Sequence, residues 1–160
     1  MHVDVKKFGR IPAGGGHRTL GRQAGRKNRR PGIGYAFLHS AVDDHPRLVY
    51  SEILTNEKRE TAAGFWERAN ALYAANGIIV LRVMTDNGSC YLSTPFNTAL
   101  GDVAHKFTRP HRPQANGKIG RFRTLDSKWA NARHYGLDAF TTSMGRTSSA
   151  YPHEAVIARF

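Results

Sequence analysis

The chain has 160 residues, enough for one domain around a single core. Its 24 Lys and Arg exceed its 12 Asp and Glu, and the net charge of +12 points first to a polyanionic partner such as nucleic acid, with solubility as the alternative explanation. A hydrophobic content of 40% argues against wholesale disorder. With no apolar run long enough for a membrane span, no secretion signal and only Cys90, the sequence predicts a cytoplasmic protein without membrane association, disulfides or a cysteine zinc site.

The first third of the chain predicts three strands and a basic loop. Residues 2–8 alternate loosely, which predicts a strand with Asp4 on one side, and a strand at the very first residues suggests that preceding sequence is missing. Residues 9–33 are rich in Gly, Arg and Lys and predict a loop that contacts phosphates, or else a solvated linker. The β-rich runs 34–42 and 48–54 predict a hairpin. Asp43 and Asp44 between them suit a turn, with metal binding as the alternative.

The remaining elements alternate between helix and strand. Apolar residues at spacings of three and four predict a helix over 56–76, with Asn56 as its N-cap and Gly77 at its exit. The nearly continuous apolar run 78–84 predicts a strand buried on both faces. The later elements, in chain order, are a short helix at 94–100, a strand at 103–108, a Pro-rich loop at 109–117, a helix at 118–135 and a poorly ordered tail at 136–160. This order predicts an α/β domain with one mixed sheet flanked by helices.

Two aspartates are candidates for a site, and one of them, Asp86, lies at the carboxyl end of a strand, where an open α/β sheet collects its sites. Asp4 lies at the centre of the first strand, and Asp86 follows the buried strand directly, before Asn87 and Gly88. Carboxylate oxygens suit Mg²⁺, and metal ions bound in this way can stabilise both the attacking and the leaving oxygens of a phosphodiester. The alternative is structural, with Asp4 in a cap and Asp86 in a turn.

Four segments together resemble the integrase catalytic core of bacterial insertion-sequence transposases, the DDE family related to retroviral integrases. They are His2-Val-Asp-Val-Lys-Lys-Phe-Gly-Arg-Ile-Pro12, Gly34-Tyr-Ala-Phe37 with Val42-Asp-Asp-His45, Thr85-Asp-Asn-Gly-Ser89, and Thr108-Arg-Pro-His-Arg-Pro-Gln-Ala-Asn-Gly-Lys-Ile119. The resemblance implies a ribonuclease-H-like fold. It assigns residues 1–135 to the catalytic core and leaves 136–160 as a tail.

The resemblance also implies a chemistry. Asp4 and Asp86 would be the first two metal-binding and catalytic carboxylates of a reaction dependent on Mg²⁺ or Mn²⁺. In that reaction water, and then a DNA 3′-hydroxyl, attacks a phosphodiester. DNA is the implied partner, and self-association is expected because two DNA ends must be joined. The residues expected to bind nucleic acid are Lys6, Lys7, Arg109, Arg112, Asn116, Lys118 and Arg121.

The third acid of the family pattern is missing. The family carries a Glu after the Asn-Gly-Lys-Ile stretch, where this chain has Gly120, and glycine has no side chain to bind a metal. Asp126 lies too far along the predicted helix to replace it, and Asp102 precedes a strand at the wrong end. The sequence therefore predicts a degenerate transposase core with weakened or lost catalysis. The alternatives are a non-catalytic basic DNA-binding remnant and the product of a broken reading frame.

Overall fold

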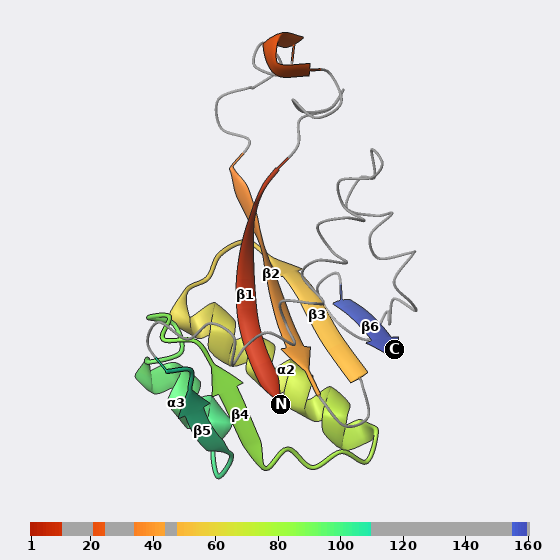
Figure 1. Ribbon diagram of the computed structural model, residues 1–160. Coiled ribbons are helices and arrows are strands. Elements are labelled where there is room, and N and C mark those ends of the chain that lie inside the picture. Colours follow the sequence, from red (N-terminus) through yellow and green to blue (C-terminus); the bar gives the residue numbers. More distant parts are fainter. Residues whose placement is uncertain (11–20, 25–33, 44–47, 110–154, 160) are drawn as a thin grey trace.

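One six-stranded mixed sheet with two helices forms the described part of the molecule (Figure 1). The computed structural model describes residues 1–10, 21–24, 34–43, 48–109 and 155–159. The strand order is β5-β4-β1-β2-β3-β6, and the bounds are β1 His2–Gly9, β2 Tyr35–Val42, β3 Leu48–Leu54, β4 Arg82–Thr85, β5 Ala104–Phe107 and β6 Ala155–Arg159. The helices are α2 Arg59–Ala75 and α3 Thr94–Leu100. Strands β1, β4 and β5 run parallel and the other pairs are antiparallel, so the predicted mixed α/β sheet is confirmed.

The predicted hairpin is the pair β2–β3. Its strands are joined in register from Phe37 opposite Leu54 to Val42 opposite Val49, and the Asp43 N–H donates to the Leu48 carbonyl at 3.0 Å. Asp43 therefore belongs to the turn, as predicted, whereas Asp44 lies outside the described residues.

Helix α2 packs its apolar stripe against the sheet. Ala62, Phe65, Trp66, Ala69 and Tyr73 are all buried at spacings of three and four, as the sequence predicted. Figure 1 shows the helix crossing behind β1, β2 and β3.

The ends of α2 correct one expectation and confirm another. The N-cap is Lys58, not Asn56, and the side chain of Lys58 makes no capping bond. Asn56 instead folds the preceding turn, since its Oδ1 accepts from the Lys58 N–H at 2.9 Å and from the Thr61 hydroxyl at 2.7 Å. Gly77 follows the helix at φ 73°, the left-handed conformation that glycine adopts without strain.

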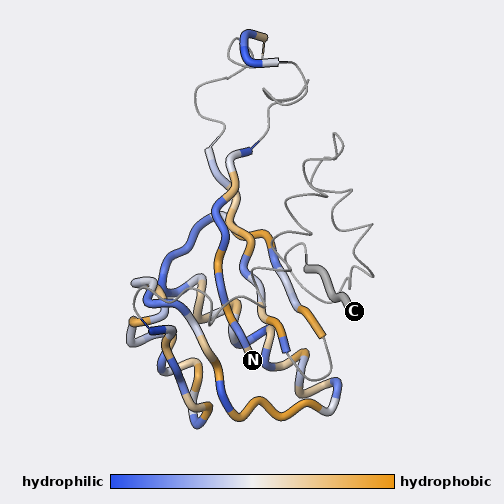
Figure 2. Tube along the Cα trace, viewed as in Figure 1, coloured by the Kyte–Doolittle hydropathy of each residue, from blue (hydrophilic) through white to orange (hydrophobic). Residues whose placement is uncertain are grey.

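The apolar run 78–84 is not one buried strand. Only its end belongs to β4, and Ile79 and Leu81 are 84% and 78% exposed. The reason lies in the neighbours, because β5 pairs with β4 only from Arg82 onward and β1 pairs with it at Met84. Residues 78–81 come before the part of the chain that forms these strand pairs, and Figure 2 shows this apolar stretch along the edge of the molecule.

The last elements partly match the prediction. Helix α3 and strand β5 are confirmed, with Ser93 as the N-cap of α3. Strand β6, which pairs with β3, lies in the segment predicted to be a poorly ordered tail, so that prediction is wrong for residues 155–159. The predicted helix over 118–135 lies outside the described residues, as does most of the loop 9–33, of which 21–24 form a helical turn. Within the described ranges, the helices are too short or too polar to span a membrane.

A buried ion pair ties α2 to the sheet. The carboxylate of Glu52 on β3 is fully buried and accepts two hydrogen bonds from Arg68 on α2, at 2.7 and 2.6 Å. Tyr50 on the same strand donates its hydroxyl to Glu52 as well. A buried carboxylate without partners is strongly destabilising, so these donors are necessary for α2 to pack here.

We predict that Arg68→Ala lowers the free energy of unfolding by about 2–3 kcal/mol, because it leaves Glu52 buried and largely uncompensated while Arg68 itself is partly exposed. Chemical denaturation measures the change. Arg59→Ala, which removes the same charge from an exposed side chain of α2, should leave stability nearly unchanged. Equal losses in the two variants would contradict the role of the buried pair.

His39 on β2 is also buried on this face of the sheet. Its Nε2 lies 3.0 Å from the Asn56 carbonyl, and its ring lies 5.4 Å from that of Phe65. Within the described residues Nδ1 has no hydrogen-bond partner. Burial lowers the pKa of His39, so the imidazole is neutral in the folded protein at pH 7.

We predict that the protein loses stability as the pH falls below about 6.5, because His39 takes up a proton in the unfolded chain before it does so in the fold. The loss continues until the pH passes the lowered folded-state pKa. Unfolding free energies measured across this range should fall less steeply for His39→Gln. An unchanged slope would rule out His39 as a source of the pH dependence.

Candidate active site

Asp4 lies in a buried polar row on the face of the sheet opposite α2. Its partner across β2 is Ser40, whose partner across β3 is Ser51, and the three residues are 3%, 5% and 1% exposed. Side chains alternate along a strand, and the neighbouring His39 and Glu52 contact α2, so this row points the other way. The Ser51 hydroxyl donates to Ser40 at 2.8 Å, and Asp4 Oδ1 accepts from the Val5 N–H at 2.8 Å. Sequence reasoning missed both serines, although each lies in a strand made mostly of apolar residues.

Asp86 begins the turn that leaves β4. Its Oδ1 accepts from the Gly88 N–H at 2.9 Å, and Gly88 in turn accepts from the N–H of Tyr91 at 3.0 Å. A β-carbon on Gly88 would lie 2.9 Å from that same Oδ1, closer than side chains tolerate. The bond from the Gly88 N–H orients the carboxylate, and a β-carbon at position 88 would push it aside.

The register of β1 and β4 brings the two aspartates to the same level. His2 pairs with Met84 in parallel, so Asp4 and Asp86 each lie two residues further along neighbouring strands. Adjacent strands are about 4.8 Å apart, and residues two positions from a pair share its face. Asp86 follows the last residue of β4, at the carboxyl end where parallel strands collect their sites. The topology therefore places the two predicted residues on neighbouring segments, Asp4 within β1 and Asp86 directly after β4.

A hydrogen-bonded chain fixes the end of β4. Asn97 of α3 donates its amide to the Ser93 carbonyl at 3.0 Å, so its Oδ1 accepts from His105 Nδ1 at 3.0 Å. The Nε2 of His105 lies 2.9 Å from the Thr85 hydroxyl, next to Asp86. Partial burial lowers the pKa of His105, which favours the neutral form of the ring.

The donor set fits a hard cation but is incomplete among the described residues. Two carboxylates on adjacent strands are typical ligands of Mg²⁺, which keeps waters in its other positions. No three His, Cys, Asp or Glu side chains gather into a metal-binding group in the described ranges, and Gly120 lies outside them. Cys90 adds no ligand or nucleophile, because burial raises the pKa of its thiol to about 11 and keeps it protonated.

Three of the residues predicted to bind nucleic acid are described. Lys7 and Arg109 are exposed and Lys6 is half-buried, with both lysines on β1 close to Asp4 and Arg109 just after β5. The other four predicted residues lie outside the described ranges: Arg112, Asn116, Lys118 and Arg121.

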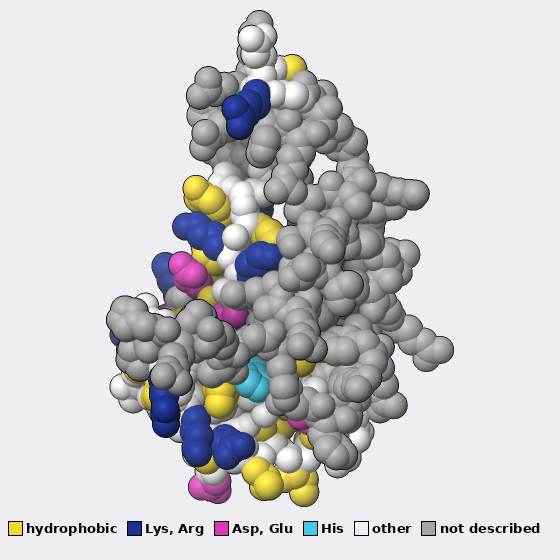
Figure 3. Space-filling view, viewed as in Figure 1, with side chains coloured by type: hydrophobic (Ala, Val, Ile, Leu, Met, Phe, Trp, Pro, Cys, Tyr) yellow, Lys and Arg dark blue, Asp and Glu magenta, His cyan; other side chains and the backbone are white. Residues whose placement is uncertain are grey.

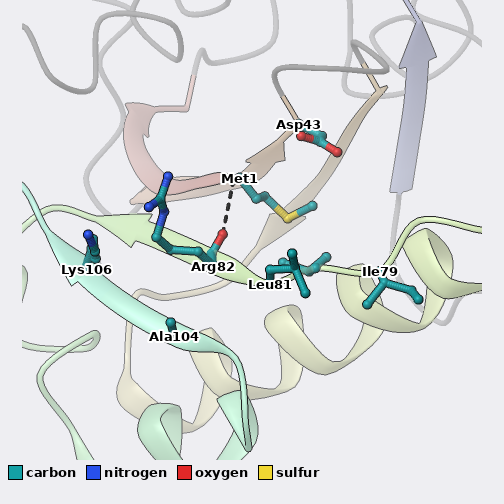
Figure 4. A pocket seen from close by; sticks show the side chains of 8 residues that line it. Met1, Asp43, Ile79, Leu81, Arg82, Ala104 and Lys106 are labelled. Atoms are coloured by element: carbon teal, nitrogen blue, oxygen red, sulfur yellow. Dashed lines mark hydrogen bonds between the residues drawn. The ribbon is translucent and has the colours of Figure 1, made fainter.

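An open pocket of about 550 Å³ lies at the other end of the parallel strands (Figure 4). Its lining includes Asp43, Leu81, Arg82 and Lys106, and the Met1 amine donates to the Arg82 carbonyl at 3.1 Å. Among the described residues that line it, Asp43 alone carries a carboxylate, and the pocket sits where the parallel strands begin, away from the predicted site.

Comparison with known proteins supports the fold and not a family assignment. No protein-family model matches the chain, and no curated protein matches it in sequence. Among solved structures, the chain is similar to one chain of a simian T-cell lymphotropic virus intasome determined by cryo-EM in complex with the PP2A regulatory subunit B56 gamma. The TM-score is 0.59 at 16% identity, over 96% of this chain and 52% of that one. The chain thus spans about half the length of this structural relative.

A second similar structure is the crystal structure of the catalytic core domain of BIV integrase. It matches with a TM-score of 0.47 at 16% identity over 81% of this chain and 68% of that one, and we draw no argument from it. The strand order β3-β2-β1-β4-β5, its mixed directions and the likeness to the intasome chain identify the fold. The chain has a ribonuclease-H-like α/β fold, as the resemblance of its motifs implied.

We predict that Gly88→Ala displaces the Asp86 carboxylate, because the added methyl group would occupy the space of Oδ1. The variant should lose about 1 kcal/mol of stability with the bond to the Gly88 N–H. It should also lose any thermal stabilisation that Mn²⁺ gives the wild type. Thermal melts with and without Mn²⁺ test both effects. Gly9→Ala is the control, since its β-carbon would meet no atom within 4 Å, and a matching response there would refute the explanation.

Proposed function

We propose that this chain is the core domain of a DNA-integrating polynucleotidyl transferase of the DDE type, weakened by the loss of its third acid at Gly120. One observation supports the proposal: His2 of β1 pairs in parallel with Met84 of β4, so Asp4 and Asp86 each follow this pair by two residues. The ribonuclease-H-like fold and the net charge of +12 support it. DNA is the proposed partner, with self-association because two DNA ends must be brought together.

Asp4 and Asp86 would hold Mg²⁺ or Mn²⁺, which when bound neutralises the charge that develops on a phosphodiester under attack. Asp4 is held by the Val5 N–H within its polar row, and Asp86 by the Gly88 N–H. These bonds fix the orientation of both carboxylates before DNA binds. Water or a DNA 3′-hydroxyl is the proposed nucleophile. Its oxygen forms a new bond to phosphorus, and one of the two ester bonds of the phosphodiester breaks, so that its oxygen leaves.

Gly120 sets the expected level of activity. The family pattern places a carboxylate at this position, and glycine contributes no oxygen to the metal. With two carboxylates, the site should bind metal weakly and cut DNA slowly.

We predict that Gly120→Glu raises the nicking of linear DNA by about two orders of magnitude, because a ligand that completes a metal site contributes several kcal/mol to transition-state stabilisation. Gel assays with Mg²⁺ or Mn²⁺ measure the rate. Asp86→Asn added to Gly120→Glu should abolish the gain. If the single variant neither cuts DNA nor is stabilised thermally by divalent ions, the proposed site is misplaced.

The second candidate function is DNA binding without chemistry. The observation in its favour is Gly120 itself, since the positive charge remains while a catalytic ligand is lost. A wild-type protein that binds DNA with an affinity falling steeply as salt rises, yet cuts none, would favour this candidate.

A further inference from the structure

Arg82 and Lys106 place two positive charges on one face of the parallel strands. Arg82 of β4 pairs with Ala104 of β5. Two residues further along, Met84 pairs with Lys106. Residues two positions apart share a face of the sheet, so the two charged side chains project to the same side. Both residues are exposed. Figure 4 shows their side chains rising from neighbouring strands, and Figure 3 shows Lys and Arg side chains gathered over β4 and β5.

The charges of these two side chains are not neutralised by a neighbouring acid. Within the described residues, neither Arg82 nor Lys106 forms an ion pair. Both line the open pocket of about 550 Å³, where Asp43 is the one carboxylate among the described lining residues. Two positive side chains against one negative side chain suit the pocket to an anion, because a hydrogen bond to a charged group is roughly twice as strong as one between neutral groups.

The two cations lead along the strands toward Asp86. Lys106 is level with Met84, and Asp86 lies two residues beyond Met84, a step of about 7 Å. Arg82 lies one step further back, about 13 Å from Asp86 along the strand. Successive phosphates of a DNA strand advance about 3.4 Å along the duplex axis. A duplex lying along β4 with one phosphate at Asp86 would therefore bring other phosphates to Lys106 after about two nucleotides and to Arg82 after about four.

We propose that Arg82 and Lys106 bind backbone phosphates of the DNA that flanks the phosphodiester held at Asp86. Contacts to phosphates carry no sequence information and fix how the DNA lies on the protein, so both are positioning residues. The proposal rests on the proposed function, because it takes DNA as the partner and Asp86 as the place of the reacting phosphate. DNA is favoured over a small anion, since contacts from exposed cations add up only along a ligand that carries many phosphates.

Binding of labelled linear DNA to the full chain, followed by fluorescence anisotropy over a range of salt, tests the proposal. Arg82→Ala and Lys106→Ala should each lower the slope of log affinity against log salt by about one, the effect of one lost phosphate contact. Each variant should weaken binding by about eightfold at roughly 0.1 M salt. The double variant should lower the slope by about two.

Two kinds of control separate these contacts from total charge and from folding. Lys58→Ala removes a charge from another exposed position, before α2, and should leave the salt slope nearly unchanged. Arg82→Lys and Lys106→Arg keep the charge and should retain most of the binding that the alanine variants lose. Thermal melts of each variant verify that the fold is intact.

A kinetic measurement links the pocket to the candidate active site. In a Gly120→Glu protein that cuts DNA, Arg82→Ala and Lys106→Ala should raise KM and leave kcat nearly unchanged, because flanking phosphates are bound equally in the ground state and the transition state. A fall in kcat with KM unchanged would contradict the assigned role.

The outcomes distinguish this inference from the proposed function. A wild-type protein that binds no DNA would overturn both. Wild-type binding that persists unchanged in the double variant would overturn the role of the pocket alone, and so would an equal loss in Lys58→Ala. Binding that depends on Arg82 and Lys106, in a protein whose Gly120→Glu variant cuts no DNA, would support the DNA contact and overturn the proposed chemistry.

Discussion

The short parallel pairing of β1 with β4 joins the two halves of the sheet. Strands β1, β2, β3 and β6 form an antiparallel half, and β4 with β5 forms a parallel one. Between the halves, His2 pairs with Met84, the Met84 N–H donates to the Met1 carbonyl at 2.9 Å, and the Met1 amine donates to the Arg82 carbonyl. The level of Asp86 relative to Asp4 depends on this junction. A slip of one residue would turn one carboxylate to the opposite face.

The two faces of the sheet carry their polar groups for different reasons. Under α2, Glu52 and Arg68 form a buried ion pair that fixes how the helix packs. Its two charges are costly to desolvate, and removing one partner strongly lowers stability. On the opposite face, Asp4 lies in line with two small hydroxyl side chains, Ser40 and Ser51. Loss of one partner of the first set would destabilise the fold, and the second set places buried hydroxyl groups in line with a carboxylate proposed to bind metal.

Asp4 and Asp86 are surrounded by different halves of the sheet. Asp4 lies on β1 opposite Ser40 of β2, in the antiparallel half. The hydrogen-bonded chain of Thr85, His105 and Asn97 lies next to Asp86, in the parallel half.

The sequence by itself determined the elements whose patterns are local. The hairpin β2–β3 follows from two β-rich runs with a turn between them, and α2 follows from its apolar stripe. Asp4 and Asp86 were also found from the sequence, because one lies at the centre of a predicted strand, the other directly follows a predicted strand, and both lie in segments that resemble the family's motifs. Tertiary structure decided the rest. The apolar run 78–84 looked like one buried strand, yet among the described residues only Arg82–Thr85 form strand pairs, and Ile79 and Leu81 before them are exposed. Strand β6 forms by pairing with β3, a partner about a hundred residues earlier that no local pattern reveals. The row of Asp4, Ser40 and Ser51, and the level of Asp86 beside it, arise from strand register, which depends on pairing between segments distant in the chain.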